Sequence, residues 1–255
     1  MEIFAQIDTW VALLTLTFLE IVLGIDNIIF ISIATSKLPK EQQRKGTNIG
    51  LVLAMVFRII LLLGISYLIA MKEPWFTIDV SWLSTEVTGQ SIILILGGIF
   101  LLYKSTSEIH HKVEGITEGE DAPKKKASTL SKVIVQIVLI DIVFSFDSVL
   151  TAVGMTNGVD GALIIMIAAV IISMIIMMIF ANPVSQFVNK HPTIQMLALS
   201  FLILIGFMLI TEGAHLANTV IFHQHIGAIP KGYLYFAIAF SLGVEALNMK
   251  IRKKK

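Results

Sequence analysis

Two short stretches of the sequence carry carboxylic acids in otherwise apolar surroundings. The first, LEIVLGIDNIIF, spans residues 19–30, and the second, LIDIVFSFDSVL, spans residues 139–150. An Asp at the centre of a membrane-spanning helix costs about 2.5 to 3.5 kcal/mol on insertion scales, so such residues usually face a polar interior and mark a pathway. The two stretches are therefore candidates for a functional site. Their polar members are Glu20, Asp26, Asn27, Asp141, Asp147 and Ser148.

Carboxylate, amide and hydroxyl oxygens form a hard ligand shell. Such a shell suits Mn²⁺, Mg²⁺ or Ca²⁺ better than Cu⁺ or Zn²⁺. The chain contains no cysteine, which excludes a thiolate metal site. Acids placed close together also repel one another, and protons then compete with the metal ion. We expect these six side chains to bind a divalent metal ion, with metal-for-proton exchange as a hypothesis.

The surroundings of these residues have the composition of membrane-spanning helices. Of the 255 residues, 56% are hydrophobic and 15% charged, and the mean hydropathy is +0.85. A bilayer core about 30 Å thick requires about 20 residues of helix. The sequence therefore predicts an all-α membrane protein with seven transmembrane helices, at residues 7–35, 47–71, 89–104, 131–155, 161–181, 194–212 and 231–249.

The Lys and Arg residues predict the orientation of the chain. They gather in residues 37–45, 104–132 and 250–255, whereas the alternate loops hold only Lys72 and Lys231. Because positively charged loops remain in the cytoplasm, we expect the N-terminus outside, the C-terminus cytoplasmic, and a multi-pass protein of the plasma membrane. The net charge of +1, without a basic stripe among aromatics, argues against a nucleic-acid partner.

An internal repeat relates the two acidic stretches. An offset of 121 residues aligns Glu20 with Asp141, Asp26 with Asp147, and Asn27 with Ser148. Three predicted helices make up each copy, so the second copy enters the membrane from the opposite side. Inverted repeats of this kind place the substrate site of a transporter near the midplane.

The repeat predicts how the chain is organised. We expect a single transmembrane transporter domain at residues 1–255. Its parts are repeat one at 1–104, a cytoplasmic linker at 105–130, repeat two at 131–213, and an outer loop with the seventh helix at 214–255.

Helix geometry predicts a break within each acidic stretch. At 100° per residue, Glu20 and Asp26 lie about 120° apart on a regular helix, so they address different neighbours unless the helix unwinds between them. Gly24 and Ser145 lie inside the two intervals, where a kink is plausible. We favour local unwinding there, which would add backbone carbonyls as ligands.

Four further ionisable residues lie in or at the ends of the predicted helices. We expect them to support the site or to take part in proton coupling. An alternative for any single acid is that it pairs with Arg58 or Lys104, or that it stays protonated. The four residues are Arg58, Lys104, Glu212 and Glu245.

In these residues the sequence resembles the TerC family of integral membrane proteins, within the lysine-exporter superfamily. The motifs that carry the resemblance are Glu20-x-x-Leu23-x-x-Asp26-Asn27 and Asp141-x-x-Phe144-Ser145-x-Asp147-Ser148, supported by residues 97–104 and 229–237. The resemblance implies efflux of a divalent metal ion, with Mn²⁺ as transported substrate and no permanently bound cofactor. It also implies contact with membrane lipid, and leaves open homo-oligomers and partners in secretion or metallation.

Three other functions compete with Mn²⁺ export. Acidic side chains can also receive Ca²⁺ or a cationic amino acid in place of Mn²⁺. An intramembrane aspartyl protease needs two aspartates, but its Tyr-Asp and Gly-x-Gly-Asp motifs are replaced here by Gly24-Ile25-Asp26 and Ser145-Phe146-Asp147. The last alternative is a membrane accessory protein that transports nothing. We expect a transporter and not an enzyme.

Overall fold

The computed structural model describes residues 7–114, 129–156, 159 and 161–252, without the side chains of residues 23, 25, 26, 66 and 147. Within these residues seven helices are long and apolar enough to cross a membrane. They are α1 (Ile7–Thr35), α2 (Lys40–Leu63), α4 (Gly89–Glu114), α5 (Leu130–Met155), α6 (Ala162–Lys190), α7 (Pro192–Leu216) and α8 (Lys231–Arg252), and a short α3 (Ile65–Ala70) follows α2. The predicted seven-helix membrane protein is confirmed.

Several helices are longer than the hydrophobic runs that predicted them. Helix α2 begins at Lys40 rather than at residue 47, and α4 continues to Glu114 rather than ending at residue 104. Residues 105–114 are therefore helical, and their place in a cytoplasmic linker stays a prediction. The extension buries Ser105 and Glu108, and the Glu108 carboxylate is compensated by its ion pair with Lys104. Its sequence is too polar to read as a membrane segment.

The chain divides into two compact units, which we describe separately. Unit 1 comprises Met1–Ala70 and Lys126–Lys190, and unit 2 comprises Met71–Lys125 and His191–Lys255. Each unit combines helices from both predicted repeats. The inversion of the repeats and the orientation in the membrane stay predictions.

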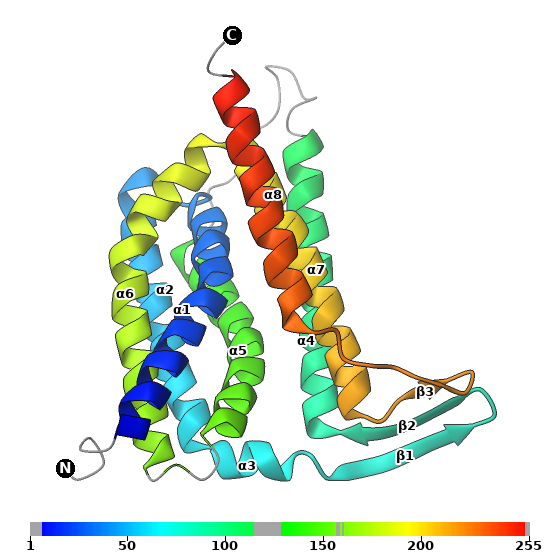
Figure 1. Ribbon diagram of the computed structural model, residues 1–255. Coiled ribbons are helices and arrows are strands. Elements are labelled where there is room, and N and C mark those ends of the chain that lie inside the picture. The colour runs from blue at the N-terminus through cyan, green and yellow to red at the C-terminus, as the bar shows by residue number, and fades with distance from the viewer. Residues whose placement is uncertain (1–6, 115–128, 157–158, 160, 253–255) are drawn as a thin grey trace. The chain divides into compact units, whose positions relative to one another are not determined.

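Unit 1 is a bundle of α1, α2, α5 and α6 (Figure 1). Helix α1 packs against α6 and α5, and α2 packs against α5 and α6. In the predicted repeats α1 corresponds to α5 and α2 to α6, so the α1–α6 and α2–α5 contacts are equivalent. The polar residues of the two acidic stretches thereby lie on neighbouring helices of one bundle.

The expected unwinding of α1 and α5 was wrong. Both helices are continuous, through Gly24 in α1 and through Ser145 in α5. Gly24 instead permits close helix packing, because a Cβ atom added there would lie 2.3 Å from Met177 Sδ of α6. Small residues at helix interfaces commonly have this role in membranes.

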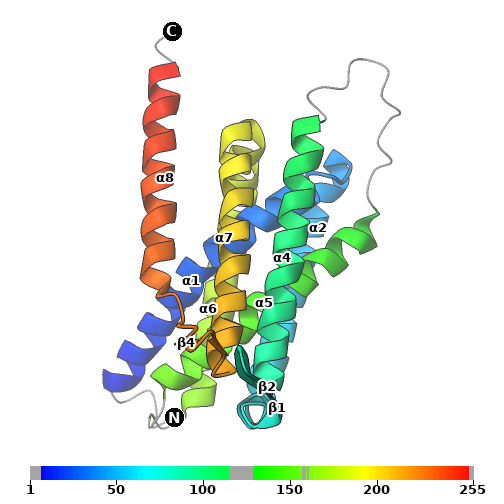
Figure 2. The same ribbon diagram turned by 90° about the vertical axis from the view of Figure 1, so that its right-hand side faces the viewer.

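Unit 2 is built on the pair α4 and α7, which lie side by side (Figure 2). A Cβ atom added to Gly98 would lie 2.5 Å from the backbone oxygen of Gly206, and one added to Gly206 would lie 2.9 Å from that of Gly98. The two backbones therefore approach as closely as glycine allows. Helix α8 contacts α7 and is otherwise largely exposed.

Unit 2 also contains a small antiparallel sheet that the sequence analysis did not predict. Its strands are β1 (Pro74–Val80), β2 (Leu83–Thr88), β3 (Val220–Ile221) and β4 (Gln224–His225), in the order β1-β2-β3-β4. Helix α7 continues to Leu216, four residues beyond its predicted end at residue 212, and the outer location of the segment that follows stays a prediction. Strands β1 and β2 run across the foot of α4 and α7 (Figure 1).

Candidate functional site

The candidate site lies in unit 1, where Arg58 of α2 meets acids from two other helices. Arg58 is 2% exposed, and its Nη1 forms an ion pair with Oε2 of Glu20 from α1. Its Nη2 lies 3.2 Å from Oδ1 of Asp141 from α5. The guanidinium carries five N–H donors in a fixed fork, so one side chain engages both carboxylates. The first acid of each predicted motif is thus joined to the other through Arg58.

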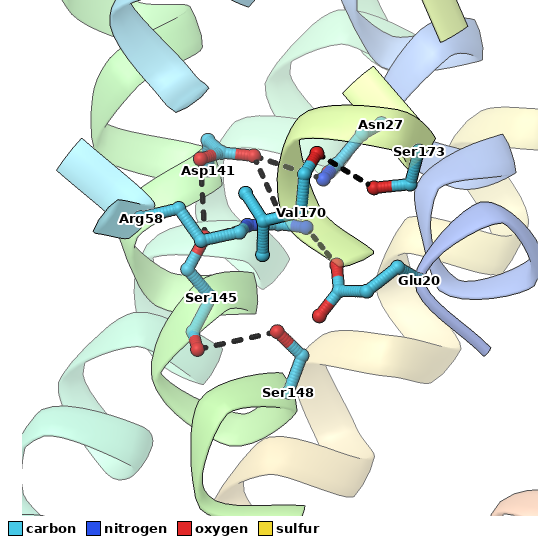
Figure 3. A network of polar contacts seen from close by, with 8 residues as sticks. All are labelled: Glu20, Asn27, Arg58, Asp141, Ser145, Ser148, Val170 and Ser173. Carbon is cyan, nitrogen blue, oxygen red and sulfur yellow. Dashed lines mark hydrogen bonds and ion pairs between the residues drawn. The ribbon is translucent and has the colours of Figure 1, made fainter. Parts of the chain in front are cut away.

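Hydrogen bonds extend this network along α5 and back to α1 (Figure 3). Arg58 Nε donates to Ser145 Oγ at 3.0 Å, and Ser145 Oγ donates to Asp141 Oδ2 at 3.1 Å. Asp141 and Ser145 can meet because residues four apart lie on the same face of a helix. Asn27 Nδ2 also donates to Asp141 Oδ1, at 3.1 Å. Asp141 therefore accepts hydrogen bonds from three side chains.

Two hydroxyl groups beside the network bond to the backbone of their own helices. Ser148 Oγ donates to the carbonyl oxygen of Ser145 at 3.3 Å, and Ser173 Oγ donates to that of Val170 at 2.9 Å. Figure 3 shows both serines near the acids. A hydroxyl that donates its hydrogen keeps its oxygen lone pairs as acceptors. Both oxygens thus retain the capacity to bind a cation.

The electrostatics of the network follow from its burial. Glu20 and Asp141 are 3% and 4% exposed, so their charges are compensated by Arg58 and by hydrogen bonds rather than by water. One guanidinium balances only one of two ionised carboxylates. The described network thus has room for a further positive charge, brought by a proton or a metal ion.

The structure places four of the six predicted metal ligands in this region. Glu20, Asn27 and Asp141 belong to the network, and Ser148 lies beside it. The side chains of Asp26 and Asp147 lie outside the described residues. Among the described side chains, no group of three or more His, Asp and Glu could hold a metal ion. In this arrangement Arg58 occupies the position between the acids.

Of the four supporting residues, only Arg58 lies in unit 1. Lys104 forms an ion pair with Glu108 four residues later in α4, with 3.3 Å between Nζ and Oε1. Glu245 of α8 accepts a 2.5 Å hydrogen bond from Thr193 Oγ1 of α7. Glu212 is half-buried in α7. These three belong to unit 2.

The structure gives Arg58 and Ser145 larger roles than the sequence predicted. The alternative that an acid pairs with Arg58 is confirmed, but the contact of one guanidinium with both Glu20 and Asp141 was not expected. Ser145 was expected only to mark a kink. One signal was available for Arg58, since a lone base inside an apolar helix requires an acidic partner. For Ser145 the signal was its spacing of four residues from Asp141 in the sequence.

Comparison with known proteins gives full-length matches. The family model described as "Integral membrane protein TerC family" matches residues 5–255. The UPF0053 inner membrane protein YgdQ of Escherichia coli K12 is 48% identical over 248 residues, which cover 97% of this chain and 95% of that protein. A UPF0053 protein of Haemophilus influenzae is 42% identical over 252 residues, covering 99% of this chain and 98% of the relative.

A longer relative contains the same region as part of its chain. The UPF0053 inner membrane protein YoaE of Escherichia coli K12 is 42% identical over 253 residues, which cover 99% of this chain but 45% of that protein. No solved structure matches the chain.

Proposed function

The chain belongs to the TerC family of integral membrane proteins, and from this premise we propose that it exports a divalent metal ion, foremost Mn²⁺, by alternating access. Its relatives YgdQ and YoaE are named inner membrane proteins, and the chain has seven candidate spans among the described residues. It is accordingly a multi-pass protein of the plasma membrane. On this proposal its role is transport and not enzymatic catalysis.

One observation carries the proposal: Glu20 and Asp141, from two different helices, converge on Arg58 inside a membrane-spanning bundle. Buried ionisable groups in membrane helices are costly, and those that are present usually mark an ion pathway or a proton relay. A purely structural ion pair would require one acid for one base. The second acid, together with Asn27 and the hydroxyl groups of Ser145 and Ser148, supports a site that exchanges cations.

Arg58 has a defined part in this proposal, as a cation that the protein itself supplies. While its guanidinium engages Glu20 and Asp141, those carboxylates are compensated and the bundle can close without cargo. An arriving metal ion competes with the guanidinium for the same oxygens. Loading then releases Arg58 toward another partner, which gives the transporter two states with different contacts, as alternating access requires.

The oxygens of the site support a hard divalent cation. Carboxylate oxygens are joined here by the amide of Asn27 and the hydroxyls of Ser145 and Ser148, and the chain has no cysteine. This set suits Mn²⁺, Mg²⁺ and Ca²⁺. Proton antiport belongs to the proposal because a carboxylate that loses its metal ion between other acids readily takes up a proton.

A specific contact favours a second candidate, the export of a cationic amino acid. The Arg58 guanidinium already rests against Glu20 and Asp141. Free arginine carries the same group and lysine carries an ammonium. A site that holds one guanidinium from the protein has the chemistry to hold one from a substrate.

Transport by the purified protein in liposomes distinguishes these functions. Mn²⁺, Ca²⁺, Mg²⁺, Zn²⁺, lysine and arginine would be offered in parallel, with and without a pH gradient. Metal export predicts Mn²⁺ movement that exceeds that of Zn²⁺ and of both amino acids. Movement of lysine or arginine without metal would replace the first proposal by the second. Metal movement indifferent to the pH gradient would remove the proton-coupling part alone.

A further inference from the structure

A second polar site lies in unit 1, between the start of α2 and the end of α6. It is a pocket of about 540 Å³, lined by residues of these two helices, and its volume is in the range of ligand-binding pockets. Figure 1 shows the first turns of α2 beside the last turns of α6. By the predicted orientation this end of the bundle faces the cytoplasm.

The α2 wall of the pocket is one face of the helix. Lys40, Gln43, Arg44 and Thr47 line it, and the spacing of three and four residues places them on the same side. Gln43 Nε2 donates to the carbonyl oxygen of Leu38 at 3.0 Å, which fixes this amide against the preceding loop. The wall therefore combines two positive charges with a fixed polar side chain.

The α6 wall repeats this spacing with uncharged groups. Asn182, Ser185, Gln186 and Asn189 line the pocket, again three and four residues apart. Ser185 Oγ accepts a 3.0 Å hydrogen bond from Ser32 Oγ of α1, which anchors the middle of this wall. Two matched polar faces on membrane helices thus meet across one cavity.

Several hydrogen-bond donors of this pocket have no partner within the described part of the chain. They are the side chains of Lys40, Arg44, Asn182 and Gln186, for which the described residues provide neither a hydrogen bond nor an ion pair. The lining residues also include no acid. The start of α2 adds its positive helix end, where Pro39 provides no side-chain cap.

The positive charge of Lys40 and Arg44 decides which ligands fit the pocket. A metal cation is repelled by Lys40 and Arg44, so the pocket is not part of the route to the acids around Arg58. A phosphate group matches the pocket, because ammonium, guanidinium and amide N–H groups all donate to its oxygens. Basic pockets between transmembrane helices on the cytoplasmic side are suited to anionic headgroups.

We propose that the pocket between α2 and α6 binds a phosphate group, as presented by an anionic lipid headgroup of the cytoplasmic leaflet or by a soluble phosphate. Lys40 and Arg44 supply the charge, and Asn182 and Gln186 supply neutral donors on the opposite wall. The site is separate from the acids around Arg58 and holds a ligand of opposite charge.

A pair of matched double variants tests this proposal. In the first, Lys40→Gln and Arg44→Gln remove both cations from the pocket. In the second, Lys45→Gln and Lys190→Gln remove two exposed cations from the same helices outside the pocket. All four residues are exposed, so both variants are expected to fold. The net charge changes equally in both, which cancels the general attraction of a basic surface for anionic lipid.

Native mass spectrometry of the purified proteins would count bound phosphatidylglycerol against phosphatidylcholine, and a second arm would offer inorganic phosphate alone. Because each lost hydrogen bond to a charged group weakens binding about tenfold or more, phosphatidylglycerol or phosphate binding should fall by at least about tenfold in the pocket variant relative to the control variant. If the pocket variant binds more weakly than the control variant only when lipid is offered, the ligand is a lipid headgroup. If the difference appears with inorganic phosphate, the ligand is a soluble anion. Equal loss in both variants, or no binding in either arm, would overturn the proposal.

A third variant addresses the uncharged wall. Gln186→Leu removes a neutral donor from the pocket without changing charge. The proposal predicts weaker binding than in the wild type, and unchanged binding would contradict the assigned role of the α6 wall.

Discussion

Arg58 of α2 and Asp141 of α5 form a buried ion pair, with 3.2 Å between Nη2 and Oδ1, although 83 residues separate them in the sequence. Asp141 also accepts hydrogen bonds from Asn27 of α1 and from Ser145. A single carboxylate therefore connects α1, α2 and α5. Changes at this carboxylate should affect both the stability of unit 1 and the handling of cations.

Removing the base of the network should destabilise the bundle strongly. Arg58→Gln leaves Glu20 and Asp141 buried without a positive partner, and the loss of one member of a buried ion pair costs about 3 to 5 kcal/mol. Arg58→Lys should be milder, because it keeps the charge but not the fork that reaches both acids. Thermal unfolding in detergent would measure both. Wild-type stability of Arg58→Lys would contradict the forked contact.

Replacing Glu20 with Gln should separate charge from shape. The amide keeps the size of the side chain but removes the ion pair with Arg58, so metal transport should fall by about 10- to 100-fold while the protein still inserts. Glu73→Gln, in the exposed connection before β1, is the matched control. Normal transport by Glu20→Gln would remove this residue from the site.

The close approach of α4 and α7 predicts that a larger residue at Gly98 lowers the stability of the protein. Gly98→Ala would bring a Cβ atom within 2.5 Å of the Gly206 backbone oxygen, and overpacking of this kind costs about 1 to 3 kcal/mol. Gly243→Ala in α8 is the control, since nothing lies within 4 Å of an added Cβ there. The control should be neutral or slightly stabilising, as alanine favours helix. Unfolding temperatures of the two variants would show the difference.

The turn between β3 and β4 carries backbone strain. Phe222 and His223 have φ angles of 48° and 66°, a left-handed conformation that costs roughly 1 to 2 kcal/mol for residues other than glycine. His223→Gly should therefore raise the free energy of unfolding by up to about 1 kcal/mol. His225→Gly, in the adjacent strand, should lower it, because glycine weakens strands. Denaturant unfolding of both variants would show whether the free energy of unfolding rises for His223→Gly and falls for His225→Gly.

The sequence identified site residues where a charged side chain is energetically costly in an apolar helix. Glu20 and Asp141 could be found because acids are rare in membrane helices, and the offset of 121 residues related them. The contact of Arg58 with both acids at once could not be found in this way, because it depends on contacts between helices far apart in the sequence. The predicted unwinding at Gly24 failed for a related reason. It assumed that one helix must present its acids together, whereas the network collects side chains from three helices.

The sheet of unit 2 was missed because its signal is short. Phe76, Ile78 and Val80 alternate with polar residues, as a half-exposed strand does, but the segment lies between long hydrophobic runs that read as helices. Strands β3 and β4 have two residues each. At that length the pairing partner, and not the local sequence, determines the structure.

Manganese transport by an Asp141→Asn variant tests the central claim most directly. Wild-type protein, Asp141→Asn and Asp79→Asn would be reconstituted in liposomes and Mn²⁺ movement followed; Asp79 is an exposed acid of β1 and serves as the matched control. The proposed function predicts transport by the wild type and by Asp79→Asn, and its loss in Asp141→Asn despite normal reconstitution. Undiminished Mn²⁺ transport by Asp141→Asn would contradict a cation site at Glu20, Arg58 and Asp141.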